Sequence, residues 1–264
     1  FLYALEGREL VWDIVEAVTG ARMTVSYGRV GGVKDDLPEN FEEMWQKARA
    51  RIMDIHATTH KLLSRNRIFL DRMEGTGILT SDQAIAWGYT GPMLRSTGVA
   101  YDVRKDHPYF KYDEVDFTVP VGTRGDNYDR YLVRMEELVQ SVYIIDQALE
   151  KMEPGPINTD DPRVMLPEKQ KVYNSIEGMI AHFKIVFEGI QVPAGEVYSY
   201  TEAGCGELGF YIVSNGTGKP WKVHVRSPSF IHMGGIHKLL EGSMIADIIP
   251  TFDTINMIGG ECDR

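Results

Sequence analysis

The sequence has few of the residues from which a chain builds a redox centre or a membrane anchor. Its 264 residues include only two cysteines, Cys205 and Cys262. Two thiols are too few for a disulfide framework or a four-thiolate cluster, so we expect both to be reduced. No apolar run approaches the roughly 18–20 residues needed to span a bilayer. No signal peptide is expected either, because the opening FLYALEGREL is acidic and interrupted early.

Acidic residues outnumber basic ones, 38 to 28, and this excludes some classes of binding partner. The net charge is −10, and the sequence shows no basic patch interleaved with aromatic residues. The chain is therefore expected to bind no nucleic acid and not to adhere directly to anionic lipid. The apolar fraction of 43% and the charged fraction of 25% are those of an ordinary globular protein with a sizeable core.

Apolar periodicity predicts a mainly helical fold with a small antiparallel β-meander, an α+β class. The length allows one large domain or two small ones, and we expect a single domain over 1–264. Asp126 and the Thr80–Gln83 pair are at helix-capping positions. Helices are expected near 11–19, 38–62, 67–73, 84–86, 126–151, 168–189, 236–240 and 244–249. Strands are expected at 196–200, 208–214 and 221–226, with a hairpin turn at 215–218 and a further short strand at 117–119.

The segment 204–209 matches the pattern GxGxxG, which in dinucleotide-binding proteins joins a strand to a helix. Here the glycines lead into Phe210-Tyr211-Ile212-Val213, which is typical of a strand. A helix N-terminus that could receive a pyrophosphate is therefore missing from the pattern. We predict a β-bend and no binding of NAD by this chain.

Histidine pairs are weak candidates for metal ligands. His56 and His60 are four residues apart on a predicted helix, and His232 and His237 are five apart, but neither pair has a third ligand nearby. No metal site is therefore predicted. A row of charged residues at helical spacing allows either a solvated face or a buried ion network: Asp126, Arg130, Arg134 and Glu137. Four more charged residues lie in a predicted loop, where a functional role is favoured more than in a helix: Arg95, Asp102, Arg104 and Lys105.

Six strings in order carry a resemblance to a known family. They are RVGGVKDDLP (29–38), GPMLRSTGVAYDVRK (91–105), GTRGDNYDRYLVRMEEL (122–138), GELGFYIVSNG (206–216), VRSPSF (225–230) and GGECDR (259–264). Together they resemble the quinone-site subunit (the 49-kDa subunit) of respiratory complex I, in its carboxy-terminal part. The resemblance implies a helical bundle like that of nickel–iron hydrogenase large subunits, with an amino-terminal part that precedes Phe1.

The tail separates this chain from the hydrogenases. Where they carry Asp-Pro-Cys-x-x-Cys, the proline position falls on Met257 and the two cysteines fall on Ile258 and Glu261. Neither supplies the thiolate that such a metal site requires, and Cys262 is one position away. The resemblance therefore implies no hydrogenase activity and no metal bound by this chain.

In the family the emptied metal cavity is a quinone chamber. The resemblance implies that Phe1, Leu2, Asn256 and Ile258 border it, which suits a hydrophobic ring that needs apolar walls. The family's His and Tyr that bind the headgroup precede Phe1, so no catalytic residue is expected in this chain. Thr24 or Val25 stands where many members carry a histidine near the partner's iron–sulfur cluster. The quinone substrate is expected to be menaquinone or ubiquinone, and the replacement of this histidine predicts a cluster of lower potential and favours a menaquinone-type acceptor.

The resemblance implies an enzyme subunit of a proton-translocating NADH:quinone oxidoreductase. NADH is oxidised elsewhere in the complex, electrons arrive through the terminal iron–sulfur cluster of a small partner subunit, and quinone is reduced at their interface. A membrane subunit at the quinone entrance is a second expected partner, and the expected location is peripheral, on the cytoplasmic face of a bacterial inner membrane. Two alternatives remain: a large subunit of a membrane-bound hydrogenase or ferredoxin-linked relative, and a non-catalytic scaffold remnant.

Overall fold

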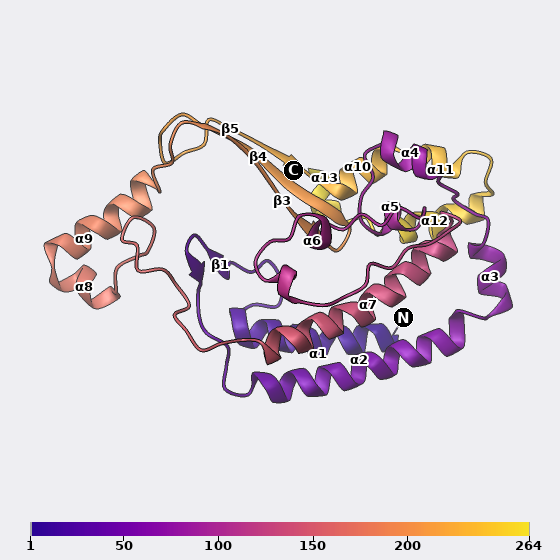
Figure 1. The fold of residues 1–264 in the computed structure, drawn as a ribbon, viewed down its shortest axis with the longest axis horizontal. Helices are drawn as coiled ribbons and strands as arrows, with labels where there is room; N and C mark the ends of the chain where they lie inside the picture. Colours follow the sequence, from indigo (N-terminus) through magenta and orange to yellow (C-terminus); the bar gives the residue numbers. More distant parts are fainter. Residues whose placement is uncertain (1, 264) are drawn as a thin grey trace. The chain divides into compact units, whose positions relative to one another are not determined.

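Helices make up most of the regular structure in residues 2–263, the part of the chain that the computed structural model describes (Figure 1). The chain divides into two compact units. Unit 1 takes the described residues of 1–55, with 153–197 and 212–223, and unit 2 takes 56–152, 198–211 and the described residues of 224–264. The α+β class predicted from the sequence is confirmed. Among the described residues, no helix is both long and apolar enough to cross a membrane.

Unit 1 begins with two antiparallel helices, α1 (Leu2–Thr19) and α2 (Phe41–Leu63), the second of which ends in unit 2. Gly7 lets them approach closely, because a Cβ there would lie 3.0 Å from Cδ1 of Ile55. Arg51 of α2 pairs with Glu6 of α1 at 2.6 Å. The glycine-rich segment after α1 forms a hairpin of β1 (Gly28–Arg29) and β2 (Gly32–Val33).

The helix predicted over 168–189 is wrong as a single element. The structure has α8 (Lys169–Asn174), α9 (Ile176–Phe183) and a π-helical turn, η2 (Lys184–Glu188). Ser175 breaks the helix because its backbone is extended and its hydroxyl accepts the amide of Gly178, which begins a new helix at Ile176. Helices α8 and α9 then pack against each other (Figure 1).

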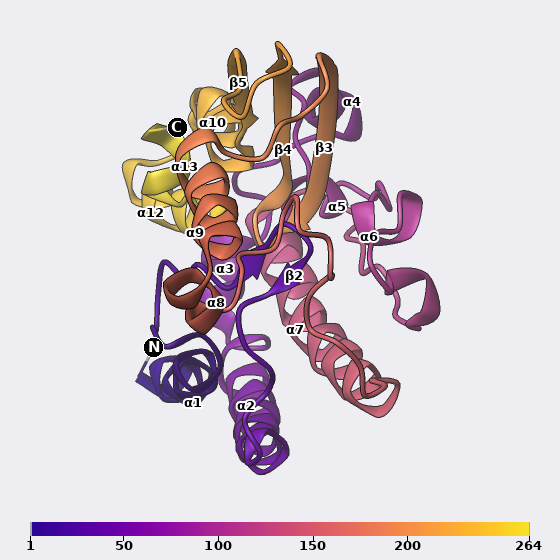
Figure 2. The same ribbon diagram turned by 90° about the vertical axis from the view of Figure 1, so that its left-hand side faces the viewer.

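The predicted meander is confirmed as a three-stranded sheet in the order β3 (Gly195–Ala203), β4 (Gly206–Ser214) and β5 (Lys222–Arg226). The strands lie side by side in both views (Figures 1 and 2). A two-residue turn, Gly204-Cys205, joins β3 to β4, so the glycine motif is the β-bend predicted from the sequence. The segment 215–218 lies in the turn between β4 and β5, also as predicted.

Unit 2 is organised around α7 (Asn127–Glu150), which is capped as predicted by Asp126. The capping box of Thr80 and Gln83 also forms, at the start of α4 (Ser81–Ala86). The other helices before α7 are short: α3 (Arg67–Met73), α5 (Pro92–Arg95), α6 (Val103–Asp106) and η1 (Tyr112–Glu114). The strand predicted at 117–119 is not formed; instead the backbone amide of Thr118 donates to Gln140 of α7.

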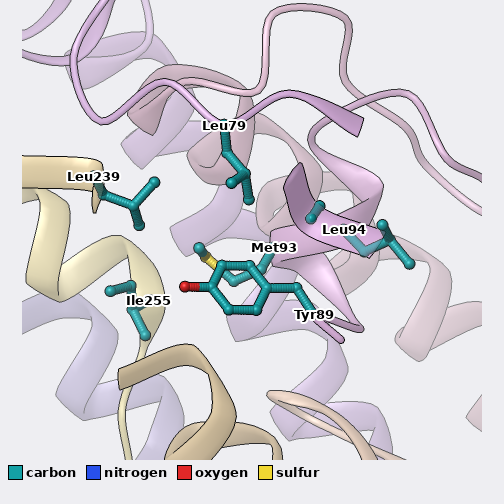
Figure 3. Packing of buried hydrophobic residues seen from close by; sticks show 7 residues of the cluster. Leu79, Tyr89, Met93, Leu94, Leu239 and Ile255 are labelled. Carbon is teal, nitrogen blue, oxygen red and sulfur yellow. The ribbon is translucent and has the colours of Figure 1, made fainter. Parts of the chain in front are cut away.

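The carboxy-terminal part of unit 2 is a run of short helices. They are α10 (Pro228–Gly234), α11 (Ile236–Leu240), η3 (Ile245–Asp247), α12 (Ile248–Ile255) and α13 (Gly259–Asp263). The predicted helix at 236–240 is confirmed, whereas the one at 244–249 is η3 followed by α12. Leu239 and Ile255 pack with Met93 and Leu94 around the ring of Tyr89 (Figure 3). This cluster joins α5 to the helices that hold the carboxy-terminal loop.

Candidate functional site

The loop between α12 and α13 carries two of the residues predicted to border a quinone, Asn256 and Ile258. Asn256 ends α12 in the left-handed region, with φ 56° and ψ 50°, a conformation that asparagine adopts more readily than other non-glycine residues. Met257 packs against the core around Tyr89, whereas the side chain of Ile258 remains 49% exposed. The loop therefore anchors itself with one apolar side chain and presents the next one outward.

Contacts from distant parts of the sequence hold this loop. The thiol of Cys205, in the β3–β4 turn, lies 3.1 Å from the carbonyl oxygen of Asn256 and donates to it. The backbone amide of Ile258 donates to the hydroxyl of Ser229 at 3.2 Å. In return, the carboxylate of Glu261 accepts from the amide of Ser229 at 3.1 Å. The loop is thus tied both to the sheet and to the N-terminus of α10.

A partly buried arginine, Arg134 of α7, contacts the end of α12 just before the loop. It donates weakly to the carbonyl oxygens of Ile255 and Arg130, at 3.4 and 3.3 Å. Its Nε atom is buried and has no hydrogen-bond partner among the described residues. Burial lowers the pKa of Arg134, with Glu137 opposing the shift. Sequence spacing alone could not distinguish this residue from its neighbours on α7.

A buried histidine lies near the same arginine. His232 is fully buried, and its carbonyl oxygen accepts from the hydroxyl of Tyr89 at 3.0 Å. Burial, followed by the charges of Arg134 and Arg226, lowers the pKa of His232 to about 3. The imidazole is therefore neutral at physiological pH, and it is packed edge-on against the Tyr89 ring at 5.0 Å. It supports the core rather than acting as an exchangeable proton donor.

A cavity of about 870 Å³ is lined by residues of α3, α7 and α12. Its wall is mostly apolar, and it includes Arg134 from α7 and Thr254 from α12. Neither Asn256 nor Ile258 is among its lining residues. The loop and this cavity are thus separate features of unit 2 that share one helix and one arginine.

Arg95 belongs to a buried ion network, one of the two possibilities that the sequence allowed for charged residues in this region. Its guanidinium lies 2.7 Å from Glu137 and 2.8 Å from Glu202, and 3.6 Å from Asp102. Burial alone would lower the pKa of Arg95, but the three carboxylates outweigh it and raise the pKa. Glu202, from β3, could not have been paired with Arg95 from sequence, because the two are 107 residues apart.

Arg130 is also structural. It is fully buried and donates to the carbonyl oxygens of Gly125 and Gly77, at 2.9 and 2.7 Å, and to Asn127 and Thr254. Asp126 accepts from the amide of Gly75 at 2.9 Å in addition to capping α7. The charged row along α7 is therefore largely buried, and its members bond mainly to neighbouring segments rather than to each other.

The remaining predicted residues lie in unit 1, except Phe1, which is outside the described residues. Leu2 begins α1 and is 77% exposed. Thr24 adopts a left-handed conformation with φ 53°, and Val25 beside it is 44% exposed. Both follow α1 in a segment without regular structure, where side chains are accessible to a partner. Their predicted roles at a quinone chamber and near a partner's cluster stay predictions.

The two histidines of α2, His56 and His60, contact each other and a nearby serine. The rings of His56 and His60 stack with centroids 6.1 Å apart, and Nδ1 of His60 lies 2.9 Å from the hydroxyl of Ser64. That hydroxyl lies 3.0 Å from the hydroxyl of Tyr131 on α7. Across residues 2–263, no three His, Cys, Asp or Glu side chains gather in a way that could hold a metal ion.

Comparison with known proteins covers the whole chain. The sequence model of the family described as "Respiratory-chain NADH dehydrogenase, 49 Kd subunit" matches residues 1–264. A Pelobacter propionicus protein, named as a subunit of NADH-quinone oxidoreductase, is 53% identical over 264 residues. Relatives of the same name from Sorangium cellulosum and Myxococcus xanthus are each 54% identical, over 265 and 264 residues. All of this chain is covered in each case, but only 66%, 66% and 64% of these relatives.

Proposed function

The chain belongs to the family of the 49 Kd subunit of respiratory-chain NADH dehydrogenase, and on that premise we propose that its carboxy-terminal loop forms part of a quinone-reduction chamber. The enzyme would be a proton-translocating NADH:quinone oxidoreductase. Its partners would be the small subunit that carries the terminal iron–sulfur cluster and the membrane subunit at the quinone entrance. The whole would lie at the cytoplasmic face of a bacterial inner membrane, with this chain bound peripherally.

The observation that carries the proposal is the exposed side chain of Ile258 on a loop with a well-defined conformation. An isoleucine that is 49% exposed gains little by facing water, whereas an apolar wall suits the ring of a quinone. The loop is fixed by the contacts of Cys205 and Ser229, so the wall is formed before the ligand arrives. Such preorganisation reduces the ordering cost of binding.

The contribution of this chain is to shape and orient rather than to transfer electrons. Asn256 supplies a side-chain amide at the edge of the loop, which can hydrogen-bond a quinone carbonyl oxygen. Met257 anchors the loop to the core, and Ile258 provides apolar surface. The electrons would come from the cluster of the partner, and no residue of this loop is proposed as a proton donor.

Replacing Ile258 by tryptophan tests the proposal. In the full-length subunit assembled in membranes, Ile258→Trp should lower NADH:quinone turnover severalfold, because the larger side chain fills space that the ring needs. Electron transfer from NADH to ferricyanide should be unchanged, since that acceptor can be reduced without the chamber. Ile245→Trp, at an isoleucine of the same unit that is 87% exposed, serves as the matched control. Unchanged quinone kinetics in Ile258→Trp would remove this residue from the chamber.

A second part of the proposal concerns Thr24 and Val25, which would lie near the iron–sulfur cluster of the partner subunit. Neither side chain titrates near neutral pH, so the potential of the nearby cluster should vary little with pH, as expected for a low-potential cluster that feeds a menaquinone-type acceptor. A redox titration of the assembled complex checks this, and Thr24→His should introduce a pH-dependent midpoint. A midpoint that moves steeply between about pH 6 and 8 in the unaltered protein would contradict it.

The carboxy-terminal residues Ile258 and Glu261 argue against hydrogenase activity. Ile258 takes the position of one metal-binding cysteine, and Glu261 takes that of the other. The carboxylate of Glu261 accepts from the amide of Ser229 at 3.1 Å, which gives it a structural role. Hard carboxylate oxygen is also a poor substitute for thiolate at a nickel–iron site. Nickel analysis of the purified complex should therefore find none in stoichiometric amount.

A further inference from the structure

We infer that Cys205 and Ser229 are positioning residues that set the conformation of the Asn256–Ile258 loop and thereby the affinity for quinone. This inference rests on the proposed function, because it assumes that the loop is a wall of the chamber. Neither residue was predicted to contribute to function from the sequence. Both act through the backbone of the loop rather than by touching the substrate.

The geometry places one contact on each side of Met257, directly before the exposed isoleucine. Cys205 donates its thiol hydrogen to the carbonyl oxygen of Asn256, and Ser229 accepts from the amide of Ile258. Here the chain leaves the left-handed conformation of Asn256, which ends α12 and turns the chain toward Ile258. External partners that satisfy the backbone at both ends hold the chain in this turn.

Cys205 is held firmly enough to act as a fixed support. It is 1% exposed, and its turn lies against the N-terminus of α5, where a Cβ on Gly91 would be 2.6 Å from the carbonyl oxygen of Cys205. Gly91 has φ 66°, so glycine is required there both for its backbone conformation and for this close approach. The turn therefore cannot shift toward α5.

The protonation state of the thiol suits a donor. Burial and the nearby charge of Glu261 raise the pKa of Cys205, while its hydrogen bond with Ser229 opposes the shift. The thiol thus keeps its proton at physiological pH and can donate it to the carbonyl oxygen of Asn256. Ser229 accepts from the amide of Ile258, two residues after the carbonyl that Cys205 contacts, so the two positioning residues hold the same short loop.

The expected consequence is a change in quinone affinity rather than in electron supply. If the carbonyl oxygen of Asn256 loses its donor, the left-handed turn can relax and Ile258 moves with it. The chamber would then bind quinone less tightly, whereas the reactions between NADH and the terminal cluster take place elsewhere. A purely structural role would instead reduce the amount of assembled enzyme and leave KM unchanged in what remains.

The test is a set of variants of the full-length subunit in the assembled, membrane-bound complex. We expect Cys205→Ala to raise the KM for a short-chain quinone about threefold, because a weak but buried hydrogen bond is lost. Cys205→Ser should restore most of the affinity, since a hydroxyl can donate to the same carbonyl oxygen. Ser229→Ala should raise KM in the same direction. Cys262→Ala, at the second cysteine of the chain, is the control and should leave KM unchanged.

Each outcome of this experiment either supports or overturns the inference. A raised KM in Cys205→Ala with recovery in Cys205→Ser, at constant NADH:ferricyanide activity, supports the inference. An unchanged KM in both Cys205→Ala and Ser229→Ala overturns it, while a changed KM in Ile258→Trp would still leave the proposed function standing. Unchanged quinone kinetics in all three variants would overturn both. If Cys205→Ala does not assemble, Ser229→Ala and Cys205→Ser give the same decision.

Discussion

Two regions of the molecule differ in which side chains they bury and which they expose to solvent. In unit 2 the interior around α7 contains fully buried charges, notably Arg95 and Arg130, whereas the α8–α9 pair of unit 1 exposes its apolar residues. On α9 the side chains of Ile176, Met179 and Phe183 are 69%, 54% and 53% exposed. The buried arginines are well supplied with hydrogen-bond and ionic partners. The burial of these two arginines in unit 2 is therefore compensated by their partners.

The largest effect is expected from removing a buried charge. Arg95→Met should lower the free energy of unfolding by about 3–5 kcal/mol, because Glu137, Glu202 and Asp102 would lose their shared cation inside the protein. Urea unfolding monitored by circular dichroism measures the change. Arg163→Met, in a pair where the arginine is 84% exposed, is the control and should destabilise the protein far less than Arg95→Met. Equal costs would contradict the distinction between the two environments.

A pH titration of stability probes the interior of unit 2 further. The pKa of His232 falls from its ordinary value of 6.5 to about 3 in the folded chain. Only the unfolded chain therefore takes up a proton as the pH falls below about 6.5, and the stability present above that pH is progressively lost. At about pH 4.5, two units lower, the loss from this residue is about 3 kcal/mol.

Replacing His232 measures how much of this pH dependence of stability comes from that residue. His232→Gln should flatten the dependence of unfolding free energy on pH between about 6.5 and 4.5, whatever its effect at neutral pH. His237→Gln, at an exposed histidine of α11, is the matched substitution for comparison. Parallel curves for all three proteins would show that His232 is not buried in its neutral form.

The contact between α8 and α9 can be tested at Gly178, which is buried. A Cβ on Gly178 would lie 2.4 Å from the carbonyl oxygen of Lys171, so Gly178→Ala should destabilise the pair by about 1–2 kcal/mol despite the better helix propensity of alanine. Gly234→Ala on α10 is the matched control, because no atom of the described residues lies within 4 Å of the added carbon. It should be neutral or slightly stabilising, as measured by urea unfolding.

The smallest effect is expected on the exposed face of α9. Phe183→Ser should change the free energy of unfolding by no more than about 0.5–1 kcal/mol, since this side chain is already 53% exposed and its main neighbour is the Phe187 ring at 4.5 Å. The same urea titration allows its change in unfolding free energy to be compared with that of Gly178→Ala. A cost of several kcal/mol would mean that this face is buried in solution.

Features encoded by a few neighbouring residues were predictable from the sequence. The capping box of Thr80 and Gln83, the cap at Asp126 and the helix Arg67–Met73 were each predicted correctly. The GxGxxG segment was also interpreted correctly as a bend, because the residues after it are typical of a strand. These features depend on hydrogen bonds within one turn of chain, and the residues that form them are close in sequence.

Features that depend on distant residues were not predictable. The continuous helix over 168–189 was wrong, because the apolar period runs through Ser175 although its backbone is extended. The strand at 117–119 was wrong, because Gln140 from α7 binds a backbone amide that a neighbouring strand would have used. For the site, the sequence pointed to Asn256 and Ile258 by resemblance, but it contained no local signal for the contacts of Cys205 and Ser229.

The proposed role of the Asn256–Ile258 loop requires that it borders a bound quinone. Photolabelling of the assembled complex with a short-chain azidoquinone, followed by peptide mapping, measures this proximity. We predict label in the tryptic peptide that follows Lys238 and contains Ile258, with displacement of the label by excess unmodified quinone. Specific, displaceable label that is confined to other peptides or other subunits, with none in residues 239–264, would contradict the proposal.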